Sequence, residues 1–345
     1  MYSFETFFVV YCLSLILFFS MLPKRKNVIE SQKKRIISTV LSKIYRKYSK
    51  FHFPIMSKFP LLNFAFPDNS VEYYIMSMEK NKTIRIRGII PNDKIKYFSI
   101  TFYDTVGNII YSRNDSNLPK YYNLKVNSYE DVCMIIRFYK KKQYQHDNFS
   151  KHLPDVLPKR TMLPKKKIIQ NSRYVQKLLS QHIETNPLPI EIDTKGIHFF
   201  VLPSKESIHS MYVNKDAVYL VALPYTMMGK ITLSKINLEC SFIGFMCSNY
   251  KTSQTDSSFS ISRERKIHVW FCQKKNIALL EKFGYRKNHD ALITWKNQNR
   301  YPILIYREVN VHKSTLKSTR NKKTHYRKEK LLPIMGDYYP MIEYF

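Results

Sequence analysis

Glycine, cysteine and acidic residues are scarce in this sequence of 345 residues. It contains 7 glycines, 5 cysteines and 26 acidic residues. The glycine-rich phosphate-binding motifs GxxxxGK(S/T) and GxGxxG do not occur in it, and neither do the GxSxG and HExxH motifs. These absences exclude the common signatures of P-loop, dinucleotide-binding, serine hydrolase and zinc protease sites.

The cysteines are few, odd in number and widely spaced. They are Cys12, Cys133, Cys240, Cys247 and Cys272. No two of them form a CxxC pair, and none has zinc-finger spacing with the histidines. This pattern argues against a disulfide scaffold and favours a reducing compartment, with the cysteines acting as small buried hydrophobic residues.

Positive charge is abundant. The chain holds 57 lysines and arginines, which gives a formal net charge of +31. Such an excess attracts polyanions, namely nucleic acid, anionic lipid head groups or acidic proteins. The cations are spread along the whole sequence, which is also rich in Lys, Ile, Asn, Tyr and Phe. Because this composition is typical of AT-rich coding, a purely compositional origin of the charge stays open beside the functional one.

The first segment, residues 1–22, is predicted to be a transmembrane anchor. Residues 7–22, FFVVYCLSLILFFSML, carry no charge and approach the length of a membrane span. An uncleaved anchor is favoured over a signal peptide because Met1–Thr6 contains Glu5 and no Lys or Arg. The alternative of a buried core helix is weaker, since a uniformly apolar run has no polar face to present to water.

Residues 23–58 form a basic juxtamembrane segment. Its first cations, expected to meet the membrane surface or another polyanion, are Lys24, Arg25, Lys26, Lys33, Lys34 and Arg35. Cations on one side of a span hold that side in the cytoplasm, so we expect a single-pass protein whose body faces the cytosol. Apolar residues from Ile37 to Tyr48 recur at helical spacing. This amphipathic helix either lies on anionic lipid or packs on the following domain.

The rest of the chain predicts a mainly β fold with two β-sandwich-like, jelly-roll-like units over residues 59–160 and 190–345. Alternating or apolar runs separated by turn signals predict strands, and residues 132–138 read as a central strand. The expected strands are 82–90, 96–104, 109–115, 121–128, 132–141, 196–203, 217–225, 229–238, 241–248, 266–274, 291–296 and 301–309.

Between the two units, residues 161–189 are expected to form a linker with one helix near 172–184. At the other end, the aromatic sequence IMGDYYPMIEYF at 334–345 differs from the basic stretch before it. We expect this tail to pack on the second unit through Met335, Tyr338, Tyr339 and Tyr344, with Gly336 allowing a turn. The stretch from Lys313 to Lys330 is expected to be a solvated loop.

Several motifs resemble an uncharacterised bacterial family that carries domains of unknown function 1254 and 1214. They are IRIRGIIPNDKIKYFSITFYDTVGNIIYSRND, MYVNKDAVYLVALPY, GKITLSKINL, IHVWFCQ, ILIYREV and IMGDYYP, in that order. The resemblance covers about residues 70–345 and implies an all-β fold of two sandwich-like units, without established catalytic residues. The thinned glycines, the anchor and the charge depart from the family, and AT-rich coding resembles that of a large DNA virus of eukaryotes.

Few residues suggest chemistry. Asp104 and Asp115 follow aromatic strands and could pair as acid and base, or simply cap turns. Asn214 and Asp216 precede a strand and could bind a ligand, or begin a turn. A second set, His146, Asp147 and His152, could form a metal site on a loop. We expect no cofactor and no resident metal.

The sequence therefore leaves two main classes of function. The favoured class is a membrane-anchored, non-catalytic structural or interaction protein, a component of a viral membrane or virion, whose partners are the lipid membrane and an acidic protein or anionic head groups. The alternative is an enzyme or a small-ligand or carbohydrate-binding protein with a pocket in a β-sandwich. Nucleic-acid binding is less favoured, because the aromatic and basic strands carry no RNP-like signature.

Overall fold

The computed structural model describes residues 53–54, 68, 70–78, 81–104, 109–128, 132–144, 146–147, 149–157, 198–201, 214, 216–238, 240–249, 255–261, 267–300, 302–309 and 328–345. The expected membrane anchor, the six cations that follow it, the amphipathic helix and the helix near 172–184 lie outside these residues. In the part of the chain that is described, no helix is both long and apolar enough to cross a membrane.

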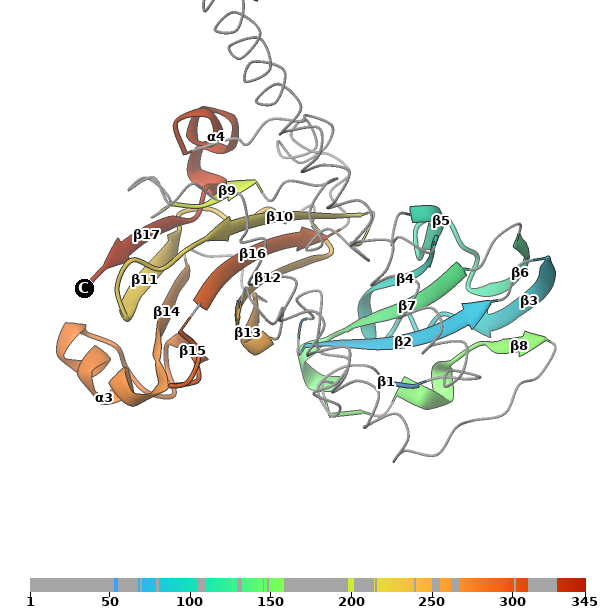
Figure 1. Ribbon diagram of the computed structural model, residues 1–345, viewed down its shortest axis with the longest axis horizontal. Coiled ribbons are helices and arrows are strands. Elements are labelled where there is room, and N and C mark those ends of the chain that lie inside the picture. The colour runs from blue at the N-terminus through green and yellow to red at the C-terminus, as the bar shows by residue number, and fades with distance from the viewer. Residues whose placement is uncertain are drawn as a thin grey trace, which may run out of the picture.

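The prediction of a mainly β chain is confirmed. Residues 53–157 build two sheets (Figure 1). Sheet A has the strand order β1-β2-β7-β4-β5, so β7 is the central strand, as its apolar sequence predicted. Its strands are β1 (Phe53–Pro54), β2 (Val71–Met78), β7 (Val132–Lys140), β4 (Ile95–Tyr103) and β5 (Ile109–Asn114).

Sheet B has three antiparallel strands in the order β6-β3-β8. They are β6 (Tyr121–Ser128), β3 (Lys82–Ile89) and β8 (Asp155–Leu157), and the 3₁₀ turns η1 (Lys142–Tyr144) and η2 (Phe149–His152) connect β7 to β8. Strand β3 alternates between exposed and buried side chains, as its sequence predicted. Its buried residues, Ile84 and Ile86, join Phe98, Ile136 and Phe138 of sheet A in one hydrophobic core.

The second half also has two sheets. Sheet C has the order β13-β12-β16-β10-β9, and sheet D the order β15-β14-β11-β17. All neighbours in these sheets are antiparallel except β14 and β15, which are parallel. The strands are β9 (Phe200–Val201), β10 (Ala217–Ala222), β11 (Met228–Leu233), β12 (Phe242–Asn249), β13 (Thr255–Ile261), β14 (Ile267–Gln273), β15 (Ala291–Trp295), β16 (Pro302–Val309) and β17 (Met341–Tyr344).

Sheets C and D enclose the larger core of the described residues. Leu220, Phe245 and Leu304 of sheet C meet Phe271 and Trp295 of sheet D there, all of them buried. A short helical segment, η4 (Lys274–Asn276), α3 (Ile277–Leu280) and η5 (Glu281–Phe283), connects β14 to β15. A connection of this kind is needed because parallel neighbours cannot be joined by a tight hairpin.

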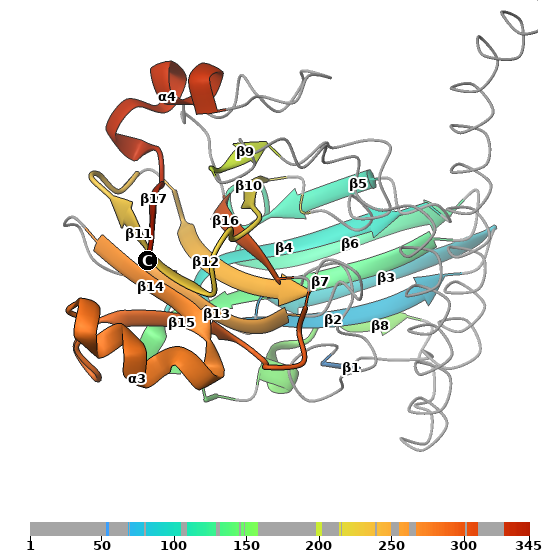
Figure 2. The same ribbon diagram turned by 60° about the vertical axis from the view of Figure 1, so that its left-hand side comes forward.

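The C-terminal tail packs on sheets C and D. Helix α4 (Lys328–Met335) and the turn η7 (Gly336–Tyr338) lead into β17, which pairs with β11 (Figure 2). Met335 and Tyr339 are buried in the core, and the hydroxyl of Tyr339 donates to the carbonyl of Phe199 at 2.7 Å. Gly336 has a φ of +53°, which favours glycine. The expected solvated loop is wrong in its last residues, because α4 already begins at Lys328.

The two halves meet through the outer faces of sheets A and C. Some side chains of β4 and β7 point away from the core between sheets A and B. These side chains contact sheet C and the segment that precedes it. For example, the ring of Tyr139 lies 4.9 Å from that of Phe242, and Tyr97 bonds to Asp216. We call this contact region the seam. The buried side chains of Asp68, Arg137, Asn214 and Arg307 lie there.

Candidate functional site

Each five-stranded sheet carries a buried arginine in its central strand. Arg137 lies in the run IIRFY of β7, and Arg307 in the run LIYRE of β16. Their exposed fractions are 3% and 1%. Because strand side chains alternate, Arg137 lies on the face opposite to the core residues Ile136 and Phe138. Arg137 therefore lies at the seam. Arg307 lies there as well, because it contacts Asp68, Tyr73 and Tyr139 of the first half.

Arg307 connects the two halves directly. Its guanidinium forms an ion pair with Asp68, and both side chains are almost fully buried. Its Nη1 donates to the hydroxyl of Tyr73 at 3.3 Å. Two rings lie near the guanidinium, that of Tyr139 from sheet A and that of Phe242 from sheet C. The centroid of each ring is 5.0 Å from the guanidinium carbon. A buried guanidinium needs such compensation, since removing it from water is costly.

Arg137 is held by hydroxyl groups and aromatic rings of its own sheet. Its Nη2 donates to Tyr103 at 2.6 Å, and its Nη1 donates to Thr101 Oγ1 at 3.3 Å. The rings of Tyr103 and Tyr73 lie 5.6 and 5.9 Å from its guanidinium carbon. Burial raises the pKa of Tyr103 to about 12, although the nearby Arg137 charge works against this rise.

Asn214 and Asp216, two of the candidate ligand residues, lie at the same seam. Asp216 Oδ2 accepts hydrogen bonds from the Tyr97 hydroxyl at 2.6 Å and from Asn114 Nδ2 at 2.9 Å. Asn214 Nδ2 donates to the Tyr139 hydroxyl at 3.3 Å, and its Oδ1 accepts from the Asp216 backbone N–H at 3.1 Å. Burial first, and then the Asp216 carboxylate, raise the pKa of Tyr97 well above its usual value.

These contacts define the seam cluster. Its members share a buried or half-buried position between sheets A and C, and contact one another through hydrogen bonds, an ion pair or ring contacts. They are Asp68, Tyr73, Tyr97, Thr101, Tyr103, Asn114, Arg137, Tyr139, Asn214, Asp216, Phe242 and Arg307. The arrangement can orient the two halves rigidly, because its donors and acceptors come from both.

The other candidates are not brought together. Asp104 follows the last residue of β4, whereas Asp115 follows the last residue of β5, at the opposite end of the β4–β5 ladder. Five residues of extended strand, roughly 16 Å, separate these ends, so the two do not form an acid–base pair. Asp115 instead accepts from the backbone N–H of Phe98 at 3.3 Å.

The interpretation of the histidine loop as a metal site is wrong. Among the described residues, no three His, Cys, Asp or Glu side chains come close enough to hold an ion. Asp147 forms an ion pair with Lys94, with 3.7 Å between Nζ and Oδ2. The ring of His152 lies 5.3 Å from that of Phe149, and burial lowers the pKa of His152.

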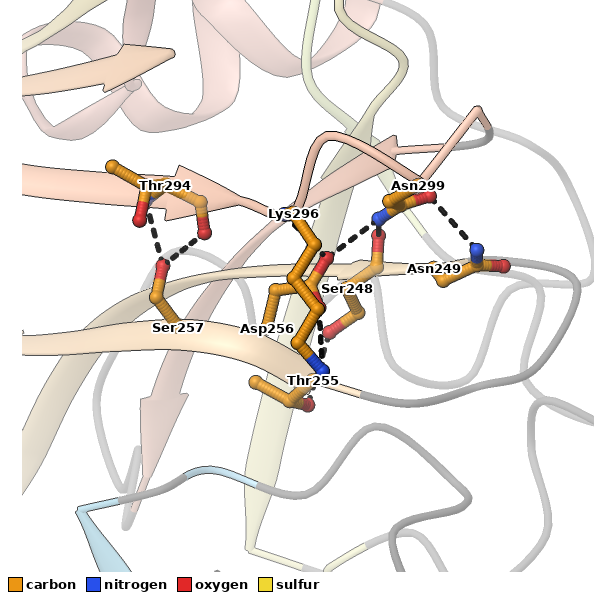
Figure 3. Close-up of polar contacts among 8 residues, drawn as sticks. All are labelled: Ser248, Asn249, Thr255, Asp256, Ser257, Thr294, Lys296 and Asn299. Atoms are coloured by element: carbon orange, nitrogen blue, oxygen red, sulfur yellow. Dashed lines mark hydrogen bonds and ion pairs between the residues drawn. The ribbon is translucent and has the colours of Figure 1, made fainter. Parts of the chain in front are cut away.

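A second polar cluster ties sheet C to sheet D (Figure 3). It comprises Ser248, Asn249, Thr255, Asp256, Ser257, Thr294, Lys296 and Asn299. The amide of Asn299 donates to Asp256 at 2.7 Å and accepts from Asn249 at 2.8 Å. Ser257 both donates to the carbonyl of Thr294 and accepts from its N–H, each at 2.7 Å. These groups use one another as partners, which indicates a structural role.

Sequence reasoning missed the two arginines and Asp68. A signal for the arginines was present, since a cation inside an apolar central strand must find partners on burial. No local pattern could identify Asp68 as the partner of Arg307, because 239 residues separate them.

The comparisons with known proteins assign no family. No family model matches this sequence, and no curated protein matches it. The solved structures that are similar to it include the following two. One is an uncharacterised protein from Burkholderia cenocepacia, 8% identical, with a TM-score of 0.49, covering 79% of this chain and 83% of that one. The other, from Vibrio parahaemolyticus, is 8% identical with a TM-score of 0.44, covering 92% and 100%. At these values neither likeness bears on function.

Proposed function

We propose that this protein is a membrane-anchored structural or interaction protein without catalytic activity. Its body consists of two β-sandwich-like, jelly-roll-like units, residues 59–160 and 190–345, which the linker of residues 161–189 connects. The seam cluster locks these units into one rigid body on the cytosolic side of the membrane. In this role it is a component of a viral membrane or virion.

The observation that supports this proposal best is how the seam cluster uses its polar groups. Asp216, one of the sequence candidates for a ligand contact, precedes β10 of the second half and already binds Tyr97 and Asn114 of the first half. Arg307 and Asp68 likewise neutralise each other across the seam. Groups engaged in this way fix the relative position of two units, which suits a scaffold that presents surfaces to partners.

The membrane part of the proposal comes from the sequence. The uncharged run at residues 7–22 is followed by Lys24, Arg25 and Lys26. An anchor flanked in this way keeps the following residues in the cytosol.

Alkaline carbonate extraction of the tagged full chain from expressing cells tests the anchor. We expect the chain to remain in the membrane pellet. We also expect added protease to digest the C-terminal tag in permeabilised cells but not in intact cells. A chain released into the supernatant would contradict the proposal. A membrane-bound chain whose C-terminal tag is digested on intact cells would contradict the orientation.

A second candidate, a protein that binds a small anionic ligand at the seam, has one observation in its favour. Arg307 Nε is buried and has no hydrogen-bond partner among the described residues. A guanidinium with a remaining donor suits a carboxylate or a phosphate. Thermal denaturation with a panel of small carboxylates and phosphates tests it. A rise in the melting temperature that Arg307→Lys abolishes would favour this candidate over the scaffold.

A further inference from the structure

The outer face of sheet B combines exposed cations with exposed apolar side chains. Strand β3 presents Arg85, Arg87 and Ile89 on the side opposite to its core residues. On the neighbouring strand β6, Tyr121 lies opposite Ile89 and Lys125 lies opposite Arg85. Directly opposite residues of antiparallel strands share a face, so these five side chains point the same way.

Strand β8 extends this surface. Leu157 lies opposite Arg85 on its other side, and Asp155 lies opposite Arg87. We call Arg85, Arg87, Ile89, Tyr121, Lys125 and Leu157 the basic face. Its three apolar members are exposed by 51% (Ile89), 69% (Tyr121) and 37% (Leu157).

The cations of the basic face have little to neutralise them. Arg85 stands directly opposite Lys125, a pairing of like charges that destabilises a sheet. Neither of these two forms an ion pair with any described residue. Asp155 lies opposite Arg87 and offsets one positive charge, which leaves the face with a net positive charge. An arrangement that costs stability in the isolated chain suits an anionic partner.

The apolar side chains indicate which anion fits. Ile89 and Leu157 are aliphatic and gain little from stacking on bases, whereas the acyl boundary of a bilayer accepts them. Tyr121 has an aromatic ring and a hydroxyl, the combination found at the level of lipid head groups. Single-strand binders instead stack two or three bases on several aromatic residues. Tyr121 is the one aromatic member of the basic face.

We propose that the basic face docks on the surface of an anionic bilayer. The inference rests on the proposed function, because the anchor supplies the membrane. Arg85, Arg87 and Lys125 contact lipid phosphates and carboxylates, while Ile89, Tyr121 and Leu157 enter the head-group layer. Residues 23–52 lie between the expected span and β1. With the expected helix from Ile37 to Tyr48, this segment can span roughly 80 Å. The tether therefore allows the face to reach the membrane that holds the anchor, at a high effective concentration.

Footprinting with hydroxyl radicals tests this docking in the full chain. The protein is reconstituted into nanodiscs of phosphatidylcholine alone or of phosphatidylcholine with phosphatidylserine. Oxidation of Tyr121 is then compared with oxidation of Tyr225, which is 76% exposed and lies on the β10–β11 turn of the other half. We expect Tyr121 to be oxidised several-fold more slowly in the anionic discs, and Tyr225 equally in both.

Two charge-reversal variants complete the design. R85E with K125E removes the protection of Tyr121, whereas K274E with K275E, which changes two exposed lysines of η4, preserves it. High salt weakens the protection. Equal oxidation of Tyr121 in both discs overturns the inference, and so does protection that requires added single-stranded RNA. A chain that does not co-elute with the discs contradicts the proposed anchor. A chain that co-elutes but shows no protection of Tyr121 contradicts only the docking.

Discussion

Cationic side chains have opposite environments at the seam and on the basic face. Arg137 and Arg307 are buried. Arg137 donates to the hydroxyls of Tyr103 and Thr101, and Arg307 to the Tyr73 hydroxyl and the Asp68 carboxylate. Arg85 and Lys125 are exposed, and each has another cation as its cross-strand neighbour. The difference is informative because composition alone predicts no such sorting. The two buried arginines have compensating partners, whereas Arg85 and Lys125 form no ion pair with any described residue.

The largest expected effect concerns the buried ion pair. Asp68→Ala leaves the Arg307 guanidinium buried without its carboxylate, which costs about 3–5 kcal/mol of unfolding free energy. Both tryptophans, Trp270 and Trp295, lie in the second half. Tryptophan fluorescence therefore follows sheet D, while circular dichroism follows both halves. We expect the two urea transitions to coincide in the wild type and to separate in the variant.

The control for this change is Asp155→Ala, which removes an exposed carboxylate of β8 beside the basic face. We expect it to alter stability by less than about 0.5 kcal/mol. If Asp68→Ala were as mild as this control, the seam would not couple the two halves.

The second prediction concerns Asp216. Asp216→Asn weakens the charge-assisted hydrogen bonds from Tyr97 and Asn114, with an expected loss of about 1.5–3 kcal/mol. The matched change is Asp337→Asn, which breaks an ion pair with Lys235 in which both side chains are about 60% exposed. We expect a clearly smaller loss there, because water screens an exposed ion pair. If both variants lost the same unfolding free energy in urea, burial at the seam would not strengthen the interactions of Asp216.

The third prediction is a pH dependence that originates at the seam. The folded-state pKa of Tyr103 is raised to about 12 from 10.0. Between these values the unfolded chain loses the phenolic proton while the folded chain retains it. Stability from this group is therefore fully present below pH 10 and falls as the pH rises toward about 12, by up to 1.4 kcal/mol per pH unit.

Tyr103→Phe removes this titration, so we expect a shallower loss of stability between pH 10 and 12 than in the wild type. Melting temperatures at a series of alkaline pH values measure it. Tyr121→Phe, which removes an exposed phenol of the basic face, is the control for the loss of a phenol outside the seam. A Tyr103→Phe slope identical to that of the wild type would contradict the assignment.

Strands with a clear period were predictable from the sequence, and strands without one were not. Strand β3 alternates, and β7 is a continuous apolar run, so both were expected where they lie. Strand β13, TDSSFSI, resembles a loop in composition. It forms because β12 offers an edge to pair with and because Ser257 bonds to the backbone of Thr294. Tertiary partners, and not local preference, decide such a strand.

The candidate site was predictable to a smaller extent. Asn214 and Asp216 were identified as polar residues before a strand, and they do lie at the seam. Their partners Tyr97 and Tyr139 resemble ordinary core aromatics in the sequence. What separates them from core residues is which face of sheet A they occupy, and that depends on the presence of a second sheet on the far side. The sequence shows the alternation but not the second sheet.

The smallest effect separates repulsion from attraction on the basic face. Arg85→Gln removes a charge that faces Lys125, so we expect a gain of a few tenths of a kcal/mol. Arg87→Gln removes a charge that faces Asp155, so we expect a loss of similar size. Both side chains are exposed and occupy non-terminal positions of β3, so the two substitutions form a matched pair. Urea unfolding at low salt should resolve the opposite signs, and high salt should bring both variants close to the wild type.

If both substitutions destabilised the chain at low salt, Arg85 would contribute to folding. Its placement opposite Lys125 would then be no reason to look for an anionic partner.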